Sequence, residues 1–162
     1  MYTIGILESG SGLSSLLQRC LPADLLAEVT LCPAADLPAG DQPDLMVVSP
    51  DLREKEAAAP ACRALLVPGR LSPLAGRIPA NWAVSYGISP RDSLTLSSLG
   101  EDDICLSLQR EVVTLTGDCL ECQELVLPRG GHTSPLHVLA CAGVQLLLGV
   151  PPEQVTVAGL ES

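Results

Sequence analysis

The sequence contains no phenylalanine, and aromatic residues make up only 2% of its 162 positions. A buried core must therefore be built from leucine, valine, alanine and isoleucine, within a total hydrophobic content of 47%. A chain of this length normally forms one domain that buries roughly two thirds of its unfolded surface. We expect a single domain over residues 1–162, in which residues 1–81 form one half and residues 82–162 the other.

Basic residues are also scarce. Nine Lys and Arg stand against nineteen Asp and Glu, which gives a net charge of −10, and Lys55 is the only lysine. Such a chain repels nucleic acid phosphates and anionic lipids, so we expect neither as a partner. We find no basic-then-apolar leader and no apolar run near 18 residues, so we expect no signal peptide, no membrane span and a cytoplasmic location. The high hydrophobic content is compatible with a homodimer, although no pattern locates its interface.

The seven cysteines are an odd number and lie mostly in apolar segments. Without a secretion signal, they are predicted to be reduced, buried thiols. Cys119 and Cys122, followed by His132 and His137, have the outline of a zinc module, C-x2-C-x9-H-x4-H. The gap between the two pairs is short for such a module, and a three-residue separation within a strand points two thiols to opposite faces. We favour structural thiols, with a zinc site or a redox pair as alternatives.

Residues 2–7 form an apolar run that leads into the turn Glu8-Ser9-Gly10-Ser11-Gly12, and the apolar residues from 13 to 21 then repeat at helical spacing. A strand, a glycine-rich turn and a helix in succession are how α/β folds build anion sites, because unpaired amides at the helix start point at the ligand. We favour a tight structural turn here. The alternative is a weak anion site formed by Ser9, Gly10, Ser11 and Gly12.

This turn does not meet the requirements of a nucleotide phosphate loop. Gly5 and Gly10 have the required spacing, but Ser11 and Gly12 occupy the positions that need a lysine and a hydroxyl residue. Glu8 would also place a negative charge beside any bound phosphate. The sequence therefore argues against a working phosphate-loop NTPase.

Short apolar runs at 29–31, 45–48, 64–67 and 82–85 are each bounded by Pro, Gly or Asp. Continuous rather than alternating apolar character is typical of central parallel strands. Residues 53–59 are the best candidate for a helix between these strands. Residues 68–81 are predicted to be a loop because prolines and glycines recur through them.

From residue 94 to residue 127 the apolar positions alternate with polar or small ones, which predicts antiparallel hairpins with turns at 109–110 and 117–118. A helix should then begin near Ser134 and Pro135 and end at Gly149. Its segment 140–143 has only small side chains, which would let a sheet approach closely. We predict an α/β fold: a Rossmann-like three-layer domain with a mostly parallel sheet and a small antiparallel β-hairpin subdomain.

His132 lies in a Gly-rich turn directly before this helix. It could donate a hydrogen bond to an anion or polarise a carbonyl group, but a turn histidine bonded to local backbone is the favoured interpretation. His137 is predicted to be a half-exposed polar position in the first turns of the helix. No catalytic set is convincing, and the nucleophile motif G-x-S-x-G does not occur.

The second half of the chain resembles the central domain of the Mur ligases, the ATP-dependent ligases that add amino acids to peptidoglycan precursors. The resemblance lies in a strand that ends in Tyr86-Gly87, the alternating strands, Gly130-Gly-His-Thr133, the Ala-rich helix and residues 148–160. The resemblance implies a nucleotide-binding α/β core. Of the family's motif before the helix, only His132 matches a functional residue. The first strand and turn would correspond to the family's phosphate loop.

This sequence lacks several residues that the Mur ligases use to bind phosphate and to catalyse ligation. The phosphate-loop lysine and hydroxyl are missing, and Thr133 and Leu136 replace the two asparagines of the helix motif. We also find no lysine suited to be the modified one, and we expect the family's substrate-binding and C-terminal domains to be absent. We therefore expect a non-catalytic binding or regulatory protein without ATP or Mg²⁺, whose partner is another protein or a small anionic ligand. The alternatives are an enzyme that acts on a phosphate-bearing ligand through His132, and a zinc-binding interaction module.

Overall fold

The computed structural model describes residues 1–10, 12–53, 55, 59–128 and 134–157. The strands are β1 (Tyr2–Leu7), β2 (Val29–Pro33), β3 (Leu45–Val48), β4 (Cys62–Pro68), β5 (Ala80–Gly87), β6 (Leu94–Leu99), β7 (Asp103–Leu108), β8 (Val112–Val113), β9 (Cys119–Leu120) and β10 (Gln123–Pro128). The α-helices are α1 (Gly12–Cys20), α2 (Ala23–Leu26) and α3 (Pro135–Leu147), and the 3-10 helices are η1 (Ala34–Asp36), η3 (Gly69–Gly76) and η4 (Pro152–Gln154).

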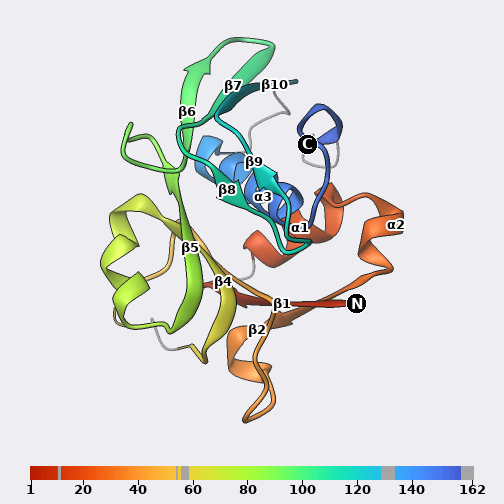
Figure 1. The fold of residues 1–162 in the computed structure, drawn as a ribbon, viewed down its shortest axis with the longest axis vertical. Helices are drawn as coiled ribbons and strands as arrows, with labels where there is room; N and C mark the ends of the chain where they lie inside the picture. The colour runs from red at the N-terminus through yellow and green to blue at the C-terminus, as the bar shows by residue number, and fades with distance from the viewer. Residues whose placement is uncertain (11, 54, 56–58, 129–133, 158–162) are drawn as a thin grey trace.

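Eight of the strands form one sheet in the order β10-β7-β6-β5-β4-β3-β1-β2, and β8 and β9 form a separate two-stranded sheet. The sheet curves around α3, with α1 beside that helix and η3 on the opposite face (Figure 1). This is the predicted α/β fold with three layers. The layer opposite α1 and α3 contains 3-10 turns and loops, because the segments between the strands are rich in proline and glycine.

The parallel part of the sheet contains β2, β1, β3, β4 and β5 in spatial order. Its central strands β1, β3 and β4 are buried on both faces along most of their length. In β3, Leu45 and Val47 belong to the core under α1 and α3, whereas Met46 and Val48 belong to the smaller core on the other face. A strand that is covered on both sides needs apolar residues at consecutive positions. The parallel strands predicted from continuous apolar runs are therefore confirmed.

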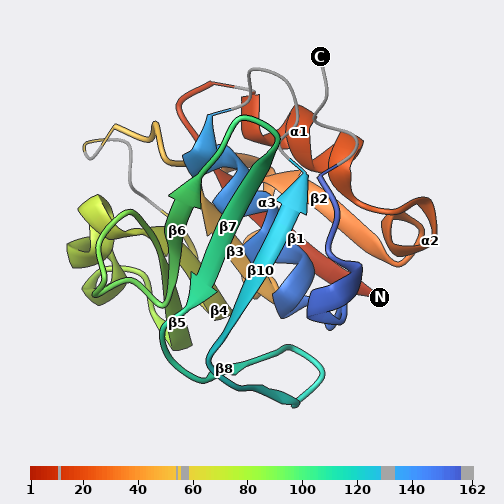
Figure 2. The same ribbon diagram turned by 90° about the horizontal axis from the view of Figure 1, so that it is seen from above.

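The antiparallel strands β6, β7 and β10 continue the main sheet beyond β5, with β7 running opposite to its two neighbours (Figure 2). β6 pairs in parallel with only the last two residues of β5, Tyr86 and Gly87. The separate hairpin β8–β9 contains the predicted turn, in which Gly117 has a φ of +91°. A positive φ favours glycine, which has no Cβ to clash with the backbone.

Helix α3 confirms the prediction made for residues 134–149. Ser134 is its N-cap residue, although its side chain makes no capping hydrogen bond, and Gly149 follows the helix with a φ of +94°. Gly143 lies against β4: a Cβ at this position would be 3.0 Å from Cδ2 of Leu66. The small side chains at 140–143 therefore permit the close approach that the sequence predicts.

Two predictions for the first half have other outcomes. The predicted loop at 68–81 is wrong, because Gly69–Gly76 form the 3-10 helix η3, with Leu71 and Leu74 buried. A 3-10 turn tolerates the proline and glycine residues that argued against an α-helix. The predicted helix at 53–59 lies largely outside the described residues.

No helix among the described residues combines the length and apolar character needed to cross a lipid bilayer.

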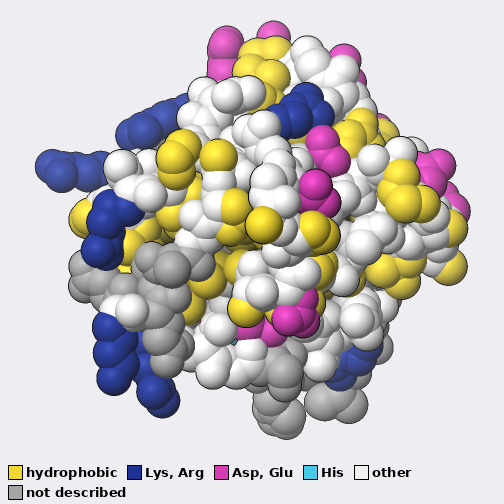
Figure 3. Space-filling model, turned by 90° about the horizontal axis from the view of Figure 1, so that it is seen from below, with side chains coloured by type: hydrophobic (Ala, Val, Ile, Leu, Met, Phe, Trp, Pro, Cys, Tyr) yellow, Lys and Arg dark blue, Asp and Glu magenta, His cyan; other side chains and the backbone are white. Residues whose placement is uncertain are grey.

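The surface charge is unevenly distributed. Several Lys and Arg side chains gather along the left edge of the face in Figure 3, where that view shows no Asp or Glu side chain. The basic residues of an acidic protein are therefore partly concentrated on one side.

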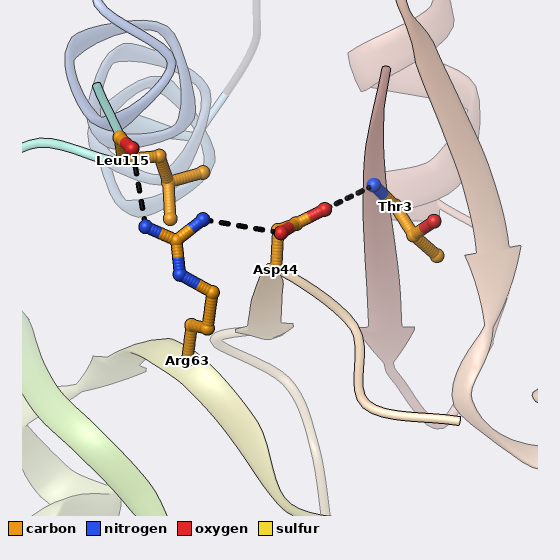
Figure 4. Close-up of polar contacts among 4 residues, drawn as sticks. All are labelled: Thr3, Asp44, Arg63 and Leu115. Atoms are coloured by element: carbon orange, nitrogen blue, oxygen red, sulfur yellow. Dashed lines mark hydrogen bonds and ion pairs between the residues drawn. The ribbon is translucent and has the colours of Figure 1, made fainter. Parts of the chain in front are cut away.

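A polar network joins the amino ends of the parallel strands. Arg63 of β4 donates to Oδ1 of Asp44 and to the carbonyl oxygen of Leu115, both at 3.2 Å, and Oδ2 of Asp44 accepts from the backbone N–H of Thr3 at 2.9 Å (Figure 4). The Arg63 and Asp44 side chains are 39% and 25% exposed, so their ion pair contributes little stability by itself. The network attaches the β8–β9 hairpin to the sheet.

Three buried groups should make the fold sensitive to alkali. Burial raises the pKa of Cys62 from 9.0 to about 11 and raises the pKa of Tyr86 well above 10. The pKa of Cys141 is raised mainly by a hydrogen bond with Cys20 and further by burial. In the unfolded chain these groups lose their protons at lower pH than in the folded protein. The stabilisation from Cys62 is complete below pH 9 and is lost as pH rises to about 11, whereas that from Tyr86 and Cys141 continues to be lost as pH approaches their own higher folded-state pKa values.

We therefore expect the urea midpoint of unfolding to fall as pH rises from 9 to 11. Cys62→Ala should reduce this slope, because it removes one of the three groups. Cys122→Ala is the matched control, since Cys122 is exposed. A slope that is the same in the Cys62 variant and the wild-type protein would contradict the assignment.

Candidate functional site

The glycine-rich turn after β1 holds a carboxylate of the chain itself. Oε2 of Glu8 accepts hydrogen bonds from the backbone N–H groups of Leu13 at 2.9 Å and Ser14 at 3.4 Å. Oε1 accepts from the hydroxyl group of Ser14 at 2.6 Å. Glu8 therefore caps the start of α1 and compensates the positive end of its dipole. A phosphate bound here would have to displace this carboxylate.

The turn lies where an α/β sheet of this topology ordinarily binds its ligand. β1 stands between β2 and β3, so the chain changes direction across the sheet at β1, and ligands commonly occupy the crevice outside the carboxyl ends of the strands at such a point. Here the two loops that border the crevice are joined: Oγ of Ser9 accepts from the backbone N–H of Arg53 at 2.9 Å. Within the described residues, the backbone N–H groups of Leu13, Ser14 and Arg53 thus already donate to side chains of the turn.

The residues predicted for an anion site are only partly described. Ser9, Gly10 and Gly12 are exposed around the start of α1, whereas Ser11 and His132 lie outside the described residues. His137 is half-buried in the first turn of α3, as predicted. The described residues therefore bring together the turn and Glu8, and the contribution of His132 stays a prediction.

The cysteines are all free, and Cys20, Cys62 and Cys141 are buried. The prediction of burial is wrong for Cys119 and Cys122, which are exposed. The prediction of a shared strand is also wrong, because β9 ends at Leu120 and a bend at Cys122 precedes β10. In this short hairpin there is no apolar layer to cover either thiol.

A carboxylate lies beside the exposed thiol of Cys119. Loss of hydration raises the pKa of its thiol, and the carboxylate of Glu111, whose Oε2 lies 3.6 Å from the Cys119 Sγ, raises it further. Within the described ranges there is no group of three or more His, Cys, Asp or Glu residues that could hold a metal ion. The zinc set considered from the sequence consists of Cys119, Cys122, His132 and His137. His132 lies outside the described ranges, so this set stays a prediction.

A pocket of about 700 Å³ lies at the carboxyl ends of β4 and β5. η3 borders it on one side and the loop at 88–93 on the other, and these two segments lie next to each other at the left of Figure 1. Its volume is in the range of small-molecule sites. The pocket lies beside the short parallel pairing of β5 with β6, and β6 in turn pairs antiparallel with β7.

Sequence analysis does not identify this pocket. Three of the nine basic residues line it, Arg70, Arg91 and Arg110, together with the buried Asp92. These residues are up to 40 positions apart and belong to no motif. An available signal is that Arg70 and Asp92 each follow the carboxyl end of an apolar strand, after Pro68 of β4 and Gly87 of β5, at the edge of the sheet where ligands bind.

Comparison with protein-family models and with curated proteins finds no match to this chain.

Proposed function

We propose that this chain is a non-catalytic binding or regulatory protein that has the scaffold of a Mur ligase central domain and does not use ATP. The observation that carries the proposal is the position of Glu8, whose carboxylate accepts the hydrogen bonds of the first amides of α1. In a phosphate loop, those amides and a lysine hold the nucleotide phosphates. Here a fixed negative charge occupies the amides, and the turn contains no lysine.

The order of elements along the second half supports the proposed kinship. β5 ends in Tyr86-Gly87, the antiparallel strands follow, and α3 comes after them. This is the order that the resemblance to the Mur ligases implies. Such a scaffold without the phosphate-loop lysine can still bind a ligand. It is unsuited to phosphoryl transfer, because that reaction depends on positive charge at the transferred group.

The proposal includes the setting in which the protein acts. We place it in the cytoplasm, with a protein partner or a small anionic ligand and with self-association as a homodimer compatible with its apolar composition. A net charge of −10 argues against nucleic acid as a partner.

Calorimetric titration with ATP, in the presence and absence of Mg²⁺, tests the proposal. We expect no binding by the wild-type protein. Glu8→Ala frees the amides of α1, so this variant should lose about 1 kcal/mol of stability and gain weak phosphate binding, with a Kd of about 1 mM or higher. The matched control is Glu28→Ala, which removes the same charge from an exposed position outside the turn. Micromolar, Mg²⁺-dependent binding of ATP by the wild-type protein would refute the proposal.

A further inference from the structure

We infer that the pocket between η3 and the loop at 88–93 is the ligand site, and that it takes a small organic molecule with one anionic group, a carboxylate or a phosphate. This inference rests on the proposed role as a binding protein and identifies where binding occurs. The site is separate from the turn at Glu8, so the two can be tested independently.

The guanidinium group of Arg70 is held in place by the chain. Its Nε donates to the carbonyl oxygen of Pro50 at 3.0 Å, and its Nη2 donates to the carbonyl oxygen of Leu52 at 2.9 Å and also to that of Pro50. Its Nη1 has no hydrogen-bond partner within the described part of the chain. Two donors of a fixed, permanently charged group therefore remain for a ligand, and a pre-positioned donor loses little entropy on binding.

Arg91 and Arg110 add two further positive charges to the rim of the pocket. Both are exposed, and neither guanidinium group has an ion-pair or hydrogen-bond partner among the residues that the structure describes. The segments that carry them are joined, because the backbone N–H of Gln109 donates to the carbonyl oxygen of Ser93 at 2.8 Å. Three arginines around one pocket of an acidic protein favour a carboxylate or a phosphate group, which guanidinium groups bind through paired hydrogen bonds.

Asp92 limits the ligand to one anionic end. Its side chain is only 4% exposed, and its Oδ2 accepts from the backbone N–H of Ser89 at 3.2 Å. The carboxylate thus lies deeper than the exposed arginines. It repels a second negative charge and accepts a hydrogen bond from a hydroxyl or ammonium group. The ligand should therefore place its anionic group at the rim and a neutral or donor end near Asp92.

The remaining walls accommodate a short carbon chain. Pro68 and Leu136 contribute apolar surface, and Ile88, which also lines the pocket, is 74% exposed. An exposed isoleucine beside a pocket is partly covered when an organic ligand binds, which adds a hydrophobic contribution. Inorganic anions lack this part of the interaction.

Calorimetric titration of the full chain with glycerol 3-phosphate, glycerate and glycerol tests the inference and distinguishes the two anionic groups. We expect at least one of the two anions to bind with a Kd of about 1 mM or tighter, and glycerol not to bind. Arg91→Ala and Arg110→Ala should each weaken binding about tenfold, the loss of one charge-assisted hydrogen bond. Arg19→Ala, which removes the same charge from an exposed position of α1 outside the pocket, should change the Kd less than about twofold.

Three results would overturn the inference: no binding of either anion, equal binding of glycerol, or equal weakening by Arg19→Ala and the two pocket variants. Because all three arginines that are changed are exposed, the variants should keep the wild-type circular dichroism spectrum. ATP binding at the first turn would refute the proposed function without affecting these titrations, so the two failures are distinguishable.

Discussion

Replacing Leu66 by alanine is expected to lower the free energy of unfolding by about 3–5 kcal/mol. Leu66 is in the middle of β4, its side chain is completely buried, and it packs in the core between the sheet and α3. Truncation removes apolar contacts and leaves a cavity, because the rigid strands on both sides of β4 prevent collapse. Urea denaturation followed by circular dichroism measures the loss.

A double-mutant cycle with Gly143 tests the geometry of this contact. In the wild-type protein, Gly143→Ala places a Cβ 3.0 Å from Cδ2 and 3.2 Å from Cδ1 of Leu66, which is tighter than ordinary contact. In the Leu66→Ala background those atoms are absent, so the added methyl group partly fills the cavity. Gly143→Ala should therefore be more favourable in that background than in the wild-type protein. Additive effects of the two substitutions would show that α3 does not approach β4 as described.

Replacing Gly87 by alanine is expected to lower the free energy of unfolding by about 2–3 kcal/mol. A Cβ at Gly87 would lie 2.5 Å from Oδ2 of Asp92, and a Cβ at Gly69 would also collide with this carboxylate. To relieve the overlap, the buried carboxylate must move and give up the backbone N–H of Ser89. The same movement should weaken anion binding in the pocket. Denaturation and the glycerol 3-phosphate titration measure the two effects.

Two further variants separate this clash from a general effect of removing glycine. Gly76→Ala is the matched control, because a Cβ at Gly76 meets no atom within 4 Å. It should be neutral or slightly stabilising, since alanine restricts the unfolded chain. Asp92→Ala removes the colliding atoms, so Gly87→Ala should cost less in that background. Equal costs of Gly87→Ala with and without Asp92 would contradict the proposed close packing.

The sequence predicts the local elements of this protein well, because burial imposes a repeating pattern on neighbouring residues. The consecutive apolar residues of β3 and β4 indicate strands that are covered on both faces, and both strands occur where predicted. The start and stop residues of α3 are likewise local signals. η3 was missed because a 3-10 helix has no distinctive apolar period, and its proline and glycine residues indicate a loop equally well.

The turn at Glu8 shows where local prediction stops. The sequence indicates a strand, a turn and a helix, and it places an acidic residue beside a possible anion site. It does not specify that the Glu8 side chain bends toward α1 and accepts the N–H groups of Leu13 and Ser14. That choice depends on the direction in which α1 leaves the sheet, which its packing against α3 determines.

Residue order alone thus determined the fold class, the acidic character and the absence of a phosphate-loop lysine, because each depends on composition or on neighbouring positions. Tertiary structure alone decided which distant residues meet. Arg70 and Asp92 share a pocket only because β4 and β5 are adjacent in the sheet, and Arg110 joins them only because β7 returns beside β6. Strand order is set by the packing of the whole core, and no local pattern of residues encodes it.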